Sequence, residues 1–358
     1  MEAKGLFNVA RKEFVDHLTS KKFILILALF LIISAYSMHV GMDHYNNRLE
    51  SYKEQISQIE EEEGPVRWMP EKPSILLIFE RLHFVMSLLG AILAIATGFD
   101  LITREKERGS LKSLLSHPVY RDEIINGKAV GGILALVLSV GIAFIILFAM
   151  LLIFSIVPDM DEFWRIVLFG AVTVLCLLTY FSIALMASTV SKDSGRALMY
   201  ALVIVLALSF AMPMIGGLVA ESVVGERPER PMSQSYVEIN VSGKVIKQIG
   251  PMNKEEEEEW ERYREERKAY NDKKWAIRDA FEIFSPDGNY GMVAVSLTVP
   301  YHLKEVHSGG GNIHYSPGDT TSVKESLEKV WKNIFALFIL PVIFFAIAYI
   351  RFMRMDIR

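Results

Sequence analysis

Residues 129–158 read AVGGILALVLSVGIAFIILFAMLLIFSIVP, a run of 30 residues without one Asp, Glu, Lys or Arg. Crossing the hydrocarbon core of a bilayer, about 30 Å thick, takes roughly 18–25 apolar residues in a helix. A helix on the surface of a soluble domain would show a polar face at every turn, and this run shows none. The run therefore predicts a helix that spans a membrane.

Five further stretches of at least 18 residues also lack Asp, Glu, Lys and Arg. They are residues 23–42, 82–99, 166–191, 197–220 and 333–350. All 38 Lys and Arg and all 42 Asp and Glu lie outside the six stretches. This distribution predicts an all-α polytopic membrane protein with six transmembrane helices, and it excludes a soluble enzyme.

The composition narrows the classes of partner and cofactor. A net charge of −4 and a pI near 6.1 argue against a nucleic-acid partner. The only cysteine, Cys176, lies in the fourth stretch, so a disulfide within one chain and a cysteine metal cluster are excluded. The first apolar stretch is too long for the core of a signal peptide and no small-residue cleavage site follows it. We expect it to be retained as a helix.

The basic residues of the short connections predict the topology. With the amino terminus inside, the inner segments contain 16 Lys and Arg in 64 residues, and the short outer segments contain 6 in 46. The inner segments would be 1–22, 100–128, 192–196 and 351–358, and the short outer ones 43–81 and 159–165. Because inner loops are enriched in Lys and Arg, we expect a multi-pass cell-membrane protein with both termini in the cytoplasm.

The segment before the first span predicts an amphipathic helix. Its apolar residues recur at helical spacing, and its charged residues occupy the other side: Leu6, Phe7, Ala10, Phe14 and Leu18 against Arg11, Lys12, Glu13 and Asp16. Such a helix lies in the headgroup plane with its apolar face toward the lipid. We therefore predict an N-terminal amphipathic elbow helix. The outer segment 43–81 is expected to begin with a short helix and to continue as a solvated loop.

The largest polar region, residues 221–332, is long enough for a small extracytoplasmic domain between spans five and six. Residues 235–249 alternate in polarity around Ser242 and Gly243, which predicts a β-hairpin. Residues 254–284 predict a charged helix with an aromatic stripe. The expected organisation is a membrane part, 1–220, a mixed α/β extracytoplasmic insertion, 221–332, and a sixth span with a cytoplasmic tail, 333–358.

The inner loop 100–128 between spans two and three is the most informative polar segment. A charged extension of span two is expected to end at Gly109, where a positive φ costs little. A short helix follows and ends at Pro118, and a third helix begins at Arg121 and leads into the next span. Two short charged helices at the inner surface suit docking of a soluble partner better than catalysis. Gly127 and Gly131, spaced as GxxxG, predict a close helix contact nearby.

This loop resembles the signature of the ABC-2 type permeases, the membrane subunits of a class of ABC transporters. In that family a Glu-x-x-x-Gly-Ser/Thr-Leu segment precedes Leu-Leu, a Pro, an Arg and a Gly-Lys. The matching positions are Glu105, Gly109, Ser110, Leu111, Leu114, Leu115, Pro118, Arg121, Gly127 and Lys128. Tyr120 departs from the family, which usually has a small polar residue there, and a tyrosine is a poor helix cap. Ser285 and Pro286 are similar to the branch with nitrous-oxide-reductase maturation and sodium-export permeases.

The resemblance implies a permease that forms the transmembrane path and works as a dimer, with a second copy or a paralogue. The chain contains no GxxxxGK[ST] sequence, so ATP and magnesium are expected on a separate cytoplasmic ABC ATPase subunit, and this chain is expected to be no enzyme. The family's inner loop seats in a cleft of that ATPase. The implied ATPase-coupling residues, none of them catalytic, are Glu105, Gly109, Ser110, Leu111, Leu114, Leu115, Pro118 and Arg121.

The sequence also argues against several other functions. No HExxH or GxSxG sequence occurs and no span contains an Asp or Glu, which argues against a membrane protease and a proton-coupled carrier. We predict no metal and no cofactor on this chain, because its histidine spacings match no compact ligand pattern. The prediction is an exporter of an unidentified substrate. The alternative is a non-transporting membrane sensor that binds a ligand through residues 221–332.

Overall fold

The computed structural model describes residues 3–61, 70, 72–109, 120–231, 236–241, 244–249, 254–298 and 322–355. Within these residues, six helical segments are long and apolar enough to cross a membrane. They are Lys21–Ile59, Ile75–Glu107, Arg121–Ile153, Met160–Val190, Ser194–Val224 and Trp331–Met353. Each covers all or most of one charge-free stretch, so the prediction of six helices with the length and composition of membrane spans is confirmed.

The first two helices are longer than the hydropathy alone indicates. Helix α1 (Ala3–Thr19) is separated only by Ser20 from α2 (Lys21–Glu61), which has 41 residues. The helix predicted at the start of segment 43–81 is present, but it is the continuation of α2 to Glu61 and not a short helix. The reason is local: residues 43–61 contain no Gly or Pro, and they include four Glu and two Gln, which favour helix.

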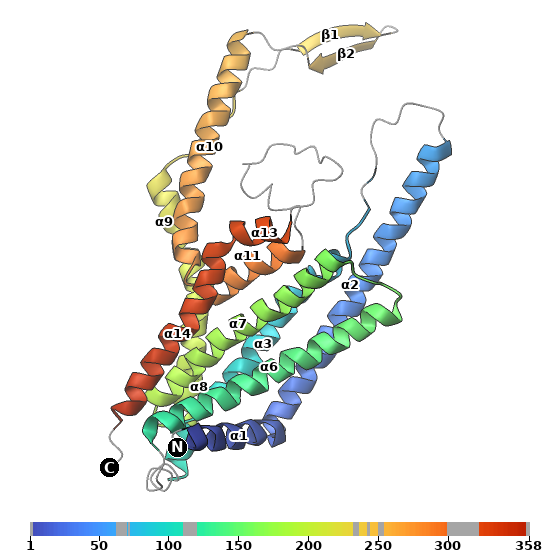
Figure 1. The fold of residues 1–358 in the computed structure, drawn as a ribbon. Helices are drawn as coiled ribbons and strands as arrows, with labels where there is room; N and C mark the ends of the chain where they lie inside the picture. Colours follow the sequence, from blue (N-terminus) through green and yellow to red (C-terminus); the bar gives the residue numbers. More distant parts are fainter. Residues whose placement is uncertain are drawn as a thin grey trace.

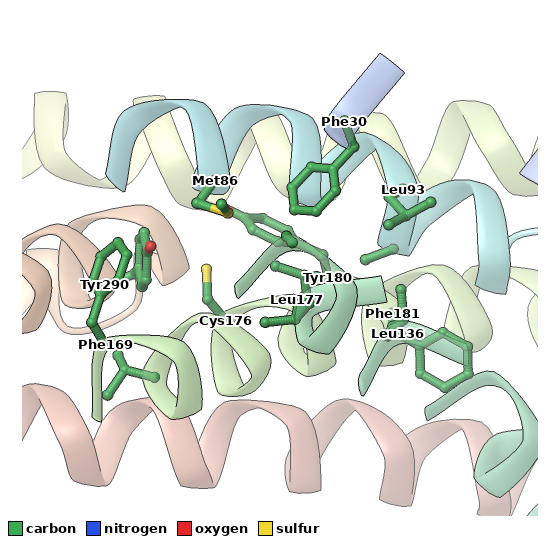
Figure 2. Packing of buried hydrophobic residues seen from close by; sticks show 14 of the residues in the cluster. Phe30, Met86, Leu93, Leu136, Phe169, Cys176, Leu177, Tyr180, Phe181 and Tyr290 are labelled. Atoms are coloured by element: carbon green, nitrogen blue, oxygen red, sulfur yellow. The ribbon is translucent and has the colours of Figure 1, made fainter. Parts of the chain in front are cut away.

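Helix α7 (Met160–Val190) lies at the centre of the bundle. The short η1 (Ile75–Phe79), α3 (Leu82–Gly98) and α6 (Arg121–Ile153) pack against it, and so does the last helix, α14 (Trp331–Met353). Figure 2 shows buried side chains of these helices pointing toward one another around Cys176, Leu177 and Tyr180 of α7. A Cβ on Gly90 would lie 2.6 Å from the Leu177 side chain, so this glycine lets α3 approach α7 closely.

The fifth span is interrupted in its middle. It consists of α8 (Ser194–Leu206), a π-helical turn, η2 (Ala207–Ala211), and α9 (Met212–Val224). Pro213 is the second residue after the turn. Its ring lacks an N–H and would clash with the carbonyl four residues earlier, at position 209, and a wider turn at that place removes the conflict.

The segment between spans five and six projects from the bundle and also returns to it. Strands β1 (Tyr236–Val241) and β2 (Lys244–Ile249) form an antiparallel hairpin in which Tyr236 pairs with Ile249. Helix α10 (Lys254–Glu282), which confirms the predicted charged helix, packs along α9. Figure 1 shows α10 and the hairpin at the end of the molecule opposite to both chain termini.

Helix α11 (Pro286–Thr298) lies among the spans, against α3, α7 and α14, and α13 (Val323–Lys329) packs on it. Tyr290 of α11 is fully buried and its hydroxyl forms a 3.0 Å hydrogen bond with Thr173 of α7. Arg165, 1% exposed, donates to the Leu297 carbonyl and to Ser326, which ties the end of α11 and the middle of α13 to α7. Part of the long polar region therefore belongs to the helical bundle.

Candidate functional site

Both chain termini, α1, the short helix α4 (Thr103–Glu107) and the beginnings of α6 and α8 lie at one end of the bundle, here called the terminal end (Figure 1). The sequence placed its coupling residues in this region. The structure describes three of them, Glu105, Gly109 and Arg121. The other five fall outside the described residues: Ser110, Leu111, Leu114, Leu115 and Pro118.

Helix α4 is attached to the last turn of α7. The Ser188 hydroxyl accepts hydrogen bonds from the backbone N–H groups of Ile102 and Thr103, at 3.0 and 3.1 Å. Lys106 donates to the carbonyls of Thr189 and Ser191, at 3.0 and 2.9 Å. The last carbonyls of a helix have no partner within it and carry partial negative charge, so an ammonium group there is favourable. These contacts hold the end of span two against the end of span four.

The same short helix also contacts the beginning of span five. Glu107 accepts a 2.6 Å hydrogen bond from the backbone N–H of Ser194 and a 3.0 Å bond from its hydroxyl. Ser194 is the first residue of α8, and a carboxylate at a helix N-terminus satisfies free N–H groups and interacts favourably with the helix dipole. One five-residue helix thus joins the ends of spans two, four and five.

Glu105 points toward the bundle. Its carboxylate lies 3.4 Å from the Lys128 ammonium of α6, and its side chain is 16% exposed. Earlier in the same loop, Asp100 pairs with Arg104 and, at 2.9 Å, with Lys22 of α2. Sequence reasoning assigned Glu105 from the family signature alone and did not predict the pair of Asp100 with Lys22. Their signal was present, because both are the first charges that flank a span.

Gly109 ends the helical extension, as predicted. Helix α4 stops at Glu107, and Gly109 has φ +68° two residues later. Glycine adopts this left-handed conformation without the strain of a Cβ atom, which is why it commonly follows a helix C-terminus. Among the described residues, its chain neighbours apart, no atom lies within 4 Å of a Cβ built on Gly109. Gly109 is therefore exposed at the tip of the described part of the loop.

Arg121 begins α6, which confirms the predicted start of the third helix of the loop. Its guanidinium donates to the carbonyls of Met353 and Met355, at 3.2 and 2.9 Å, and so holds the end of the last span. Tyr120 is the N-cap residue, and the Glu123 carboxylate accepts from its backbone N–H at 3.1 Å. Glu123 therefore supports the helix start, a contribution that a tyrosine side chain cannot make.

The terminal end is thus a charged layer in which residues of the loop between spans two and three bind four other spans. With six helices of membrane-spanning length, these features define a polytopic membrane protein whose loop is mechanically connected to its spans. The family described as ABC-2 family transporter protein matches residues 7–357 of the chain, and the chain belongs to this family. No curated protein compared with the chain matches it.

Proposed function

We propose that the chain is the permease subunit of an ATP-driven transporter and moves a substrate outward across the membrane. A separate cytoplasmic ATPase supplies the energy by docking on the loop 100–128. The observation that carries the proposal is the set of hydrogen bonds of α4. Because Lys106 and Glu107 bind the ends of spans four and five, a displacement of the loop reaches three spans at once.

The proposal places the terminal end in the cytoplasm, in agreement with the excess of Lys and Arg in the segments at that end. It assigns α1 as the elbow helix at the membrane surface. Phe7 and Val15 of α1 are 66% and 47% exposed, and lipid would cover such apolar side chains. Leu111, Leu114 and Leu115 are proposed to form the apolar side that seats in the ATPase, with Ser110 and Pro118 setting the ends of that segment.

The transporter is proposed to contain two permease chains, and residues 221–332 to form a mixed α/β outer insertion, of which α11 returns to the helical bundle. The projection of α10 and the hairpin beyond the spans supports an outer domain (Figure 1). We also propose that the chain belongs to the family branch that includes nitrous-oxide-reductase maturation and sodium-export permeases. The support is Ser285, whose hydroxyl accepts from the Gly288 N–H at 3.0 Å and so begins α11 at the Ser-Pro pair.

The decisive experiment is affinity purification of the chain from its native membrane, followed by identification of the ATPase that co-purifies. Arg108 is exposed beside Gly109, so the Arg108→Glu variant tests docking without breaking an internal contact of Glu105 or Arg121. Arg48→Glu is the matched control, because Arg48 is exposed near the other end of α2. We expect Arg108→Glu to reduce recovery of the ATPase and Arg48→Glu to leave it unchanged.

Recovery of no ATPase with the wild-type chain would refute the proposed function. Equal recovery with wild type and Arg108→Glu would refute the placement of the docking surface at this loop.

A further inference from the structure

Helix α1 is seated in a groove of α6 that only glycine can form. A Cβ on Gly127 would lie 2.7 Å from the Cβ of Val9, and one on Gly131 would lie 2.8 Å from the carbonyl oxygen of Ala10. Both distances are shorter than ordinary contacts, so the two backbones touch where the glycines stand. The close helix contact predicted at Gly127 and Gly131 is confirmed, and its partner is α1.

A buried ion pair lies in the same contact. The Lys128 ammonium is 2.6 Å from the Glu13 carboxylate, and the two side chains are 5% and 10% exposed. The sequence-based placement of Glu13 on the polar side of α1 with Asp16 is wrong, because the α6 groove covers Glu13 and leaves Asp16 exposed. Because water is largely excluded, separating this pair costs more than separating an exposed one.

Lys128 connects three elements at one atom. Its ammonium contacts Glu13 of α1 and, at 3.4 Å, Glu105 of α4, while its own backbone belongs to α6. The loop that is proposed to dock the ATPase is therefore joined to α1 as well as to the spans described above.

Helix α1 is in turn nearly continuous with the first span. The backbone N–H of Ser20 donates to the His17 carbonyl at 3.1 Å, and the Ser20 carbonyl accepts from Ile24 at 2.9 Å, so hydrogen bonding continues through the joint. A displacement of α1 must therefore move the beginning of α2. No other residue separates the two helices.

From this geometry we infer that Lys128 is a positioning residue, which makes α1 and α6 move as one body and delivers displacement of the docking loop to the first span. The inference rests on the proposed function and assigns α1 a role in transmission, beyond that of a surface helix. The pair could also be a staple that only stabilises the fold, so the test needs a readout of movement.

The test uses the Glu13→Gln variant, which keeps the size of the side chain and removes its charge. Asp16→Asn is the matched control, since it also replaces a carboxylate by an amide, but on the exposed side of α1. Spin labels are placed at Lys12→Cys and Met160→Cys, both exposed, in a Cys176→Ser background. The distance between the labels is measured in the complex with the co-purified ATPase, diluted with unlabelled chain, before and after trapping with ATP and vanadate.

In wild type and Asp16→Asn we expect trapping to change the distance. In Glu13→Gln we expect the change to fall to about half or less, and ATP hydrolysis by the complex to fall about fivefold, while the amount of bound ATPase stays the same. If Glu13→Gln does not assemble, Glu13→Asp, which keeps the charge and shortens the reach, should show an intermediate change.

The outcomes separate the two proposals. A wild-type distance change in Glu13→Gln, or in Glu13→Asp where only that variant assembles, overturns the role of Lys128 and leaves the proposed function standing. The same holds if trapping moves no label in wild type although the ATPase is bound. Recovery of no ATPase with the wild-type chain overturns the proposed function itself.

Discussion

Replacing Lys128 by Met should destabilise the protein strongly, because it leaves a buried carboxylate without its cation. Glu13, 10% exposed, would keep His17, whose Nε2 lies 3.7 Å away, and an electrostatic attraction to Arg104 without a direct contact. Burial, the largest cause, lowers the pKa of His17 from 6.5 to about 4, so this ring is neutral at pH 7 and supplies no charge. Glu105, more exposed than Glu13, can turn toward water.

Removing one partner of a buried pair costs about 3–5 kcal/mol, and this range applies here because both side chains of the pair are nearly covered. In the double variant Lys128→Met/Glu13→Gln both charges of the buried pair are removed, and only Glu105, which can turn toward water, loses a partner. We therefore expect it to lie within about 1–2 kcal/mol of wild type and to be more stable than Lys128→Met alone.

The assay is equilibrium unfolding in mixed micelles at pH 7, followed by circular dichroism, with a check that the transition is two-state. Lys12→Met is the control. Lys12 is exposed on α1, the helix that contains Glu13, and we expect its replacement to change the free energy of unfolding by no more than about 0.5 kcal/mol. The reasoning is refuted if Lys128→Met loses less than about 1 kcal/mol, or if the double variant is no more stable than the single one.

Three further predictions concern other contacts. Gly131→Ala should weaken the packing of α1 on α6 and lower the free energy of unfolding by about 1–3 kcal/mol. Gly141→Ala on the same helix should not, because no described residue comes within 4 Å of a Cβ there. Equal effects of the two variants would contradict the groove. Arg165→Met removes a donor from Ser326 and the Leu297 carbonyl, so hydrogen exchange in α11 and α13 should speed up, by about 2 kcal/mol of opening free energy, and unchanged exchange would exclude this tie. The folded pKa of His17, about 4, lies below its ordinary 6.5, so the unfolded chain takes up the proton first as the pH falls. The free energy of unfolding should therefore decrease as the pH drops from about 6.5 to about 4. Between pH 7 and pH 5 the stability of His17→Asn should change less than that of wild type, and identical changes would contradict the assignment.

The sequence alone determined the six spans and the residues at which helices end and begin in the loop. A membrane helix forms because about 20 successive apolar residues leave water, and that free energy adds up segment by segment without reference to other helices. The ends at Gly109 and Arg121 are similarly local, since a left-handed glycine and a helix start with Glu123 in its first turn depend only on their neighbours in the chain.

Only the tertiary structure decided which charged residues are buried and which segments join the core. Residues 286–298 contain Pro, Gly, Asn and Ser and are too short to read as a span, yet α3, α7 and α14 enclose them. In the sequence, Glu13 is a charged residue of the same segment as Lys12 and Asp16. The groove at Gly127 and Gly131 determines which face of α1 packs against α6. The physical reason is that burial of one polar side chain depends on a partner far along the chain, here 115 residues away at Lys128, and no local pattern encodes that pairing.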